Sequence, residues 1–440
     1  MPSRGQTEGL VGTTDRWVLV AVLALGLLHG SFWAVVLPPW SLADEPQHLD
    51  YILSVKDGVG LRHVPSIWQP LRADVREAVW QSKRWETYRQ PPPQSRDDWI
   101  AGGTTSYEGY QPPVYYVAMV PVVYLAGSDP LRAMYAVRFA GAVLVGVMAA
   151  LTGLLAVEWF GAARRSVPLL AGLIVATSPV VAATARVTND GLIAVLVGLG
   201  VYLAARLYRS PTLRASLWLG LTVAAAILTK SPGRLLMPVA VVVLLGLRRR
   251  GELSRRMVAA ALGPGVMAWL LWATLIYLRY DVPDETSVFV VHIGRIFPTL
   301  SPGEFAAGLW ERSWSSSGID APGFRGLRLA GTTLFTAMVA CGLLAFCRPP
   351  RPTMAICLTL VVALGIVVVA RMANVAGLLP PIGRVLPPAH LPVSALTAGG
   401  LVRVLGRRGA FVPVLLLGGV ALLLEIVWVW PWYQGSLAPG

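Results

Sequence analysis

The chain is 440 residues long, and 55% of its residues are hydrophobic while only 14% are charged, with a mean hydropathy of +0.61. A soluble domain cannot bury so much apolar surface, so these values exclude an ordinary soluble globular protein and indicate an integral membrane protein. The formal net charge of +14 does not indicate a nucleic-acid-binding protein, because the basic residues form short clusters between apolar runs and no basic face or reading motif accompanies them.

Apolar runs recur along the whole chain, and a membrane-spanning helix requires about 20 residues of this kind. The runs lie at about 17–38, 131–160, 166–186, 191–208, 215–230, 234–248, 257–279, 327–347, 353–371, 388–405 and 411–431. If each basic cluster lies in the cytoplasm, the runs alternate sides without conflict. We therefore expect an all-α, polytopic transmembrane helix bundle of about 11 spans (range 10–13), which forms a single domain over residues 1–440. We expect the protein to lie in the plasma membrane with its N-terminus in the cytoplasm.

Two polar segments are expected on the outer side, residues 39–130 with short interfacial helices and residues 281–326. Within the first, Pro112 to Ala126 is apolar, but it begins with two prolines and is short for a span. We interpret it as an interfacial or re-entrant helix. A crossing there would place Asp190, Lys230 and Arg384 on the side opposite to Asp44.

The first polar motif, Asp44-Glu45-Pro46-Gln47-His48-Leu49-Asp50-Tyr51, directly follows the first apolar run. Carboxylates at an apolar boundary can act as bases or bind a divalent cation, and a helix after Pro46 would place His48 and Tyr51 on one face. The same residues also suit a plain helix N-terminus, where acids complement the helix dipole and proline fits the first turn. The spacing leaves both interpretations open.

Three further motifs have functional and structural interpretations. Gln111 precedes a Pro-Pro-x-Tyr-Tyr segment, which is typical of a helix start. Asn189 and Asp190 lie in a short turn between two apolar runs, where they could be ligands or helix caps. Lys230 and Arg234 flank a break between two runs, where they could bind a phosphate or snorkel to headgroups. His63, His292 and His390 show no metal-ligand spacing and are expected to be structural.

The order of these motifs resembles the GT-C superfamily of membrane glycosyltransferases. The motifs are Asp-Glu-Pro-x-His-x-x-Tyr after the first run, Gln-Pro-Pro-x-Tyr-Tyr, and Asn-Asp-Gly. Their order is similar to that of bacterial relatives of protein O-mannosyltransferases and aminoarabinose transferases. A later strip, Trp310 to Gly318, and Gly383-Arg384 also resemble a largely uncharacterised family of bacterial membrane proteins, which usually shows Gly-Arg-Tyr where this chain has Val385. The resemblance extends from about residue 17 to about residue 430.

The resemblance implies an enzyme that moves a sugar from a polyprenyl-phosphate donor to an acceptor hydroxyl of a glycan, lipid or protein on the outer face, with inversion at the anomeric carbon. It implies Asp44 as the general base, with Glu45 assisting or holding a divalent cation together with His48. The remaining residues that it implies for substrate binding are His48, Tyr51, Gln111, Asn189, Asp190, Lys230, Arg234 and Arg384. No other cofactor is expected.

Two other functions are open at the level of sequence. A transporter or flippase of a lipid-linked substrate would place ionisable residues near the midplane and repeat its broken helices, and neither feature is evident here. A non-catalytic protein of cell-envelope assembly would keep the fold without the activity. Replacing Asp44 separates these possibilities, because only an enzyme would lose sugar transfer while still inserting into the membrane.

Overall fold

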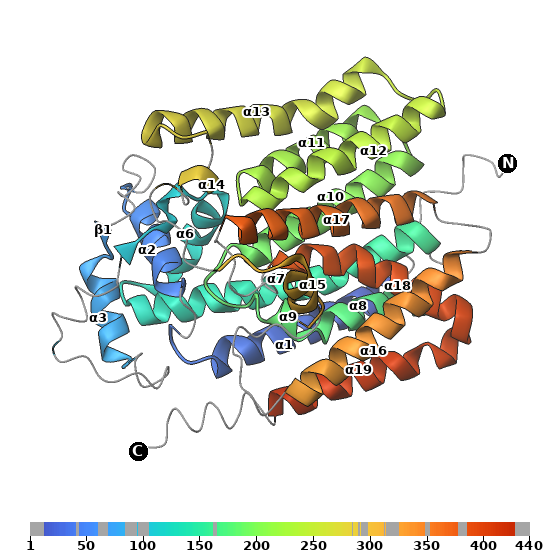
Figure 1. The fold of residues 1–440 in the computed structure, drawn as a ribbon, viewed down its shortest axis with the longest axis horizontal. Coiled ribbons are helices and arrows are strands. Elements are labelled where there is room, and N and C mark those ends of the chain that lie inside the picture. The colour runs from blue at the N-terminus through green and yellow to red at the C-terminus, as the bar shows by residue number, and fades with distance from the viewer. Residues whose placement is uncertain are drawn as a thin grey trace.

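The computed structural model describes residues 13–40, 44–59, 69–83, 95, 105–161, 165–283, 285–288, 291, 298–311, 313, 325–347, 353–376 and 385–426. Over these ranges the chain is almost entirely helical, and it confirms the expected all-α bundle (Figure 1). The exception is a pair of two-residue strands, β1 (Gln69–Pro70) and β2 (Thr105–Ser106), which pair antiparallel.

Seven of the described helices are long and apolar enough to cross a bilayer. An eighth crossing results if α18 (Pro387–Gly409) and α19 (Phe411–Leu424), which meet at 98°, form one broken span. The expected count of about eleven spans therefore remains a prediction. The seven are α1 (Thr13–Val36), α7 (Pro130–Phe160), α10 (Asp190–Arg209), α12 (Leu236–Arg249) with the preceding 3-10 turn η2 (Ser231–Leu235), α13 (Arg255–Tyr280), α16 (Arg325–Leu344) and α17 (Thr353–Val375).

Shorter helices arise where the sequence breaks an apolar run. The expected span at about 166–186 is divided into α8 (Ser166–Ala176) and α9 (Pro179–Ala182), because Pro179 cannot continue the hydrogen bonding of α8. Pro232 likewise lies just after the end of α11 (Leu213–Ile227), where the chain enters η2. A short turn, η5 (Ala345–Cys347), follows α16.

Helices α1 and α7 pack at close range through glycines. A Cβ atom added to Gly146 of α7 would lie 2.7 Å from the carbonyl oxygen of Leu23 in α1, and one added to Gly30 of α1 would lie 2.8 Å from the Cα of Ala142. Small residues at such positions let two membrane helices approach backbone to backbone. This contact fixes the C-terminal end of α1, from which the first polar motif continues.

The short elements of the first polar segment gather at one end of the bundle (Figure 1). They are α2 (Glu45–Lys56), α3 (Ala73–Gln81), the two strands, η1 (Glu108–Tyr110) and α6 (Val114–Ala126), together with α14 (Glu285–Val288) from later in the chain.

Helix α6 lies alongside α2. Near its start, the hydroxyl of Tyr116 is 2.9 Å from Nδ1 of His48, and near its end the hydroxyl of Tyr124 donates to the carbonyl of Lys56. The amide of Val114 donates to the carbonyl of Leu228 at the end of α11. Both ends of α6 therefore lie at the same end of the bundle, which agrees with a helix that does not cross the membrane.

The second polar segment is described in part, and several hydrogen bonds attach it to α16, α17 and α18. Nη1 of Arg371 in α17 donates to the carbonyl of Leu300 at 2.7 Å, just before α15 (Pro302–Glu311). Nε2 of His390 in α18 donates to the carbonyl of Ser313 at 2.5 Å. His390 thus links α18 to the second polar segment, whereas His63 and His292 lie outside the described residues.

Candidate active site

The candidate site begins where α2 starts. Pro46 lies in the first turn of α2, where its fixed φ suits a helix. Asp44 occupies the N-cap position, yet its side chain makes no capping hydrogen bond. Its Oδ1 instead accepts a 2.5 Å hydrogen bond from the hydroxyl of Tyr107. Helix capping therefore does not account for this acid, which points toward the loop before η1.

Glu45, the second acid of the motif, has a different environment. Nε and Nη2 of Arg138 donate to its two carboxylate oxygens at 2.9 and 2.6 Å, and both side chains are almost fully buried. Nη1 of Arg138 also donates to the carbonyl of Leu37, just after α1, at 2.5 Å. The structure thus does not place Glu45 beside His48 as a second cation ligand. Its oxygens are bound to Arg138, and the pair holds the turn that presents Asp44.

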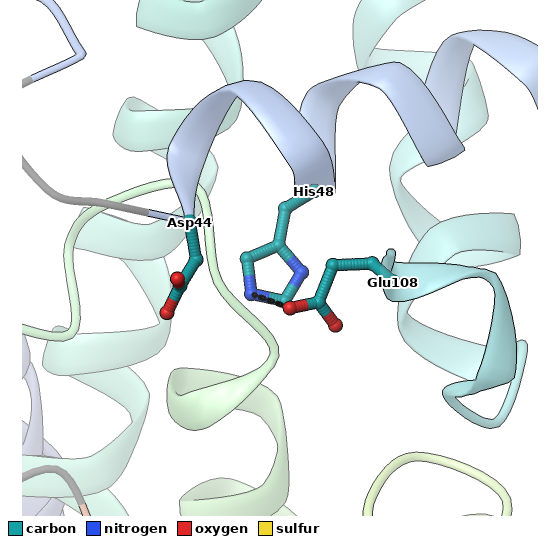
Figure 2. Close-up of side chains that lie close together, drawn as sticks. All are labelled: Asp44, His48 and Glu108. Atoms are coloured by element: carbon teal, nitrogen blue, oxygen red, sulfur yellow. Dashed lines mark ion pairs between the residues drawn. The ribbon is translucent and has the colours of Figure 1, made fainter. Parts of the chain in front are cut away.

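Asp44 and His48 converge with a residue from a different part of the chain, Glu108 of η1 (Figure 2). One ligand atom from each of the three lies within 4.8 Å of the other two, and His48 Nε2 is 3.8 Å from Glu108 Oε1. His48 and Glu108 are buried, and Asp44 is half-buried. Because cation–ligand distances are about 2.0–2.6 Å, one ion could contact all three atoms. The nitrogen and carboxylate donors suit a divalent cation.

The Tyr116 hydroxyl orients the imidazole of this group. It lies 2.9 Å from His48 Nδ1 and donates to Glu108 Oε2 at 3.4 Å. The tautomer of His48 with its proton on Nδ1 fits this arrangement, because the hydroxyl proton can then be directed at Glu108. The lone pair is then on Nε2, the atom that faces Glu108. Such a hydrogen bond to the second ring nitrogen is usual for metal-binding histidines.

Asp50 brings the distant Glu108 segment to α2. Its Oδ1 accepts from the amide of Arg72 at 2.8 Å, and its Oδ2 accepts from the hydroxyl of Ser106 at 2.7 Å. Ser106 belongs to β2 and directly precedes Tyr107 and Glu108. Burial raises the pKa of Asp50, and burial followed by the charge of Asp44 raises the pKa of Tyr107 well above its usual value. The Tyr107 hydroxyl therefore remains a donor at neutral pH.

Tyr51, Gln111 and Asn189, three expected binding residues, are linked by hydrogen bonds. The Tyr51 hydroxyl donates to the backbone carbonyl of Gln111 at 3.4 Å, and Asn189 Nδ2 donates to Gln111 Oε1 at 3.3 Å. Gln111 Nε2 in turn donates to the Tyr110 hydroxyl at 3.1 Å. These bonds connect α2, η1 and the start of α10.

Asp190 and Lys230, expected as separate candidates, form an ion pair. Lys230 Nζ is 2.5 Å from Asp190 Oδ1, and Nη2 of Arg186 is 3.5 Å from Asp190 Oδ2. Lys230 is about one-fifth exposed, whereas Asp190 is buried. Arg234 lies in the same turn, η2, and is half-buried. Arg384 lies outside the described residues.

The group of Asp44, His48 and Glu108 and the ion pair of Asp190 with Lys230 belong to one polar region. The Tyr115 hydroxyl is hydrogen-bonded to the backbone of Thr188, two residues before Asp190, and the Tyr115 ring makes an edge contact with the ring of His48. Together with the bond from Asn189 to Gln111, this joins the acidic group of α2 to the ion pair between α10 and η2.

Sequence reasoning missed Tyr107, Glu108, Arg138 and Arg186. Glu108 lies in a polar loop without a recognisable motif, and the one available signal is that it comes three residues before Gln111 in the Gln-Pro-Pro motif. Arg138 is a charged residue inside an otherwise apolar run, which by itself predicts a buried partner. The identity of that partner depends on the tertiary structure.

Residues 27–288 match the profile of a family described as a predicted membrane protein, DUF2142. The chain belongs to this family. The matched segment covers more than half of the chain. It contains every candidate site residue that the structure describes, from Asp44 to Arg234. No curated protein sequence matches the chain.

Solved structures similar to this chain include an ArnT and an archaeal oligosaccharyltransferase, which have the GT-C fold. ArnT from Cupriavidus metallidurans in the apo state has a TM-score of 0.53 and 18% identity, with 97% of this chain and 75% of ArnT covered. The apo oligosaccharyltransferase of Archaeoglobus fulgidus has a TM-score of 0.47 and 12% identity, with 96% of this chain and 56% of that chain covered. The chain thus spans little more than half the length of the oligosaccharyltransferase. The likeness to ArnT shows a GT-C-like membrane glycosyltransferase fold.

Proposed function

We propose that the protein transfers a sugar from a polyprenyl-phosphate lipid to an acceptor hydroxyl at the outer face of the plasma membrane. The observation that carries this proposal is the convergence of Asp44, His48 and Glu108 in one polar region with the Asp190–Lys230 pair. A carboxylate base and a cation for a leaving phosphate are the two groups that such a transfer requires. The GT-C-like fold supports the same reaction class.

Asp44 is the general base of the proposed reaction. It takes the proton of the acceptor hydroxyl as that oxygen attacks the anomeric carbon, and the bond from this carbon to the phosphate oxygen breaks. A single displacement of this kind inverts the anomeric centre. The hydrogen bond from the Tyr107 hydroxyl to Oδ1 holds the carboxylate of Asp44 in position.

Lys230 stabilises the negative charge that develops on the departing phosphate. An ammonium group has three N–H donors, so Lys230 can bind Asp190 and still donate to a phosphate oxygen. Asp190 fixes the position of the ammonium group, and Arg186 on its other oxygen limits its movement. Arg234 and Arg384 are further phosphate ligands in this proposal. The role of Arg384 rests on the resemblance to GT-C enzymes alone.

Asp44, His48 and Glu108 are the proposed ligands of a divalent cation. A bound cation would add positive charge to the site, which would help to stabilise the departing phosphate. A carboxylate has two oxygens with two lone pairs each, so cation binding by Asp44 is compatible with its accepting a proton.

The distribution of charge along the helices supports an outer location of the site. Helix α10 starts at Asp190 and ends with Arg206 and Arg209, and α12 follows the Lys230 turn and ends with Arg248 and Arg249. The site and the arginine clusters therefore lie at opposite ends of these helices. Since arginine clusters favour the cytoplasmic side, the site faces outward and the donor lipid is used there.

The decisive experiment measures release of undecaprenyl phosphate from a panel of undecaprenyl-phosphate hexoses and pentoses, with the purified chain in vesicles and an envelope extract as acceptor source. We expect Asp44→Asn to lower the rate at least about 100-fold while the protein remains folded, because a general base contributes that much. Glu77→Gln changes another carboxylate of the same outer segment and should leave the rate unchanged.

Two results would overturn the proposal. One is full transfer by Asp44→Asn. The other is movement of intact lipid-linked sugar across the vesicle membrane without release of undecaprenyl phosphate, which would indicate a transporter. Absence of both activities across the panel, with the wild-type chain folded, would favour an assembly protein.

A further inference from the structure

The outer end of α13 contributes an aromatic wall to the candidate site. Trp272 and Ile276 of this helix pack in one cluster with Tyr110 of η1, and Tyr107 and Tyr280 are packed against that cluster. Figure 1 shows the end of α13 over α14, at the end of the bundle where α2 and α6 lie. None of the α13 residues belongs to the motifs recognised in the sequence.

This wall directly adjoins the groups proposed to react. Tyr107 donates to Asp44, and Tyr110 accepts from Gln111. The cluster thus lies between the lipid-facing surface of α13 and the acidic group on α2.

Trp272 is 7% exposed, and among the described residues nothing accepts a hydrogen bond from its indole Nε1. A buried tryptophan N–H usually has a partner, so this donor requires an explanation. On the other side of Tyr110 and Gln111, Oδ1 of the fully buried Asn189 likewise has no donor within the described part of the chain.

An unmatched donor and an unmatched acceptor beside a cluster of packed aromatic side chains define the chemistry of the missing partner. A phosphate offers acceptors to Trp272 but no donor to Asn189. A sugar hydroxyl both donates and accepts, and the C–H face of a pyranose or furanose packs well against an aromatic ring.

We propose that Trp272 recognises the sugar moiety of the lipid donor, through its ring face and through a hydrogen bond from Nε1 to a sugar hydroxyl. This inference rests on the proposed function. It assigns to α13 a residue that determines specificity for the sugar, whereas residues at η2 bind the phosphate.

The test compares binding of two probes to the purified full-length chain: undecaprenyl phosphate, and undecaprenyl phosphate that carries a single sugar, selected as the tightest-binding of the panel. Trp272→Phe keeps an aromatic ring and removes the N–H. We expect it to weaken binding of the glycosylated lipid about 3- to 10-fold, as for loss of one hydrogen bond, and to leave binding of the bare lipid within about twofold. Trp272→Leu, which also removes the ring, should weaken binding of the glycosylated lipid further.

Trp269→Phe is the matched control, because Trp269 lies one turn away on α13 and is 46% exposed. It should bind both probes as the wild-type chain does, and thermal melting of each variant in the same samples verifies its folding. If Trp272→Phe and Trp272→Leu keep the full preference for the glycosylated lipid, the inference is overturned and the proposed function stands. An equal loss for both probes also overturns it. If the wild-type chain binds both probes equally, the proposed function fails and the inference fails with it.

Discussion

At the scale of single residues, the two adjacent acids of the first motif have separate roles. Asp44 bonds to Tyr107 and joins His48 and Glu108, whereas Glu45 is bound to Arg138 in the interior. A helix turns by about 100° per residue, so neighbouring side chains at its start point in different directions. The separation is a direct consequence of that geometry.

Arg138 should be essential for stability. Arg138→Met leaves the buried Glu45 carboxylate without its charged partner and the end of α1 without a donor, and removing one member of a buried pair costs about 3–5 kcal/mol. We expect a clear drop in the thermal unfolding midpoint. Arg132→Met, on an exposed arginine of the same helix, should not change it. An unchanged midpoint for Arg138→Met would contradict this role.

Asp50 should make stability depend on pH. Burial raises its pKa in the native state, so the native protein binds this proton more tightly than the unfolded chain does. The contribution of Asp50 to the free energy of unfolding is therefore largest below the usual aspartate pKa of about 4 and decreases as pH rises through the raised value. Asp50→Asn should remove this slope, so that the variant gains stability relative to wild type between low and neutral pH. A parallel pH dependence of the two unfolding midpoints would contradict this prediction.

At the scale of elements, the position of Asp44 depends on how closely α1 approaches α7. Gly146→Ala would place a methyl group 2.7 Å from the Leu23 carbonyl and force the helices apart, at a cost of about 1–3 kcal/mol. We expect a lower unfolding midpoint together with lower transfer activity. Gly263→Ala in α13 meets nothing within 4 Å and should be neutral or slightly stabilising, because alanine favours helix. Equal effects of the two variants would contradict the close contact.

Sequence patterns predicted elements better than they predicted spans. Long apolar runs such as 131–160 and 257–279 correspond to α7 and α13, because twenty or more apolar residues form a helix in a bilayer whatever their neighbours. The run at 166–186 contains Pro179 and divides into two helices, and the last two runs form helices that meet at 98°. Hydropathy alone does not distinguish a span from a broken or re-entrant helix.

At the scale of the whole molecule, orientation is the property on which the proposed function depends. In a chain whose three cysteines are replaced, Ser128→Cys before α7 should react with a membrane-impermeant maleimide added outside intact cells. Glu252→Cys, beside the arginines that end α12, should react only after the cells are permeabilised. The reverse pattern would place the site in the cytoplasm and contradict use of the donor at the outer face.

The sequence by itself determined the membrane class, the helical fold and two of the three residues of the candidate group, because these depend on composition, on apolar length and on residues close together in the chain. Asp44 and His48 are one helical turn apart, and the breaks at Asp190 and Lys230 are visible as interruptions of apolar runs. The tertiary structure alone decided that Glu108 completes the group and that Lys230 pairs with Asp190. It likewise decided that Glu45 belongs to Arg138. These partners lie 40 or more residues apart in the chain, and they meet only because helix packing and the bonds of Asp50 bring separate segments to one end of the bundle.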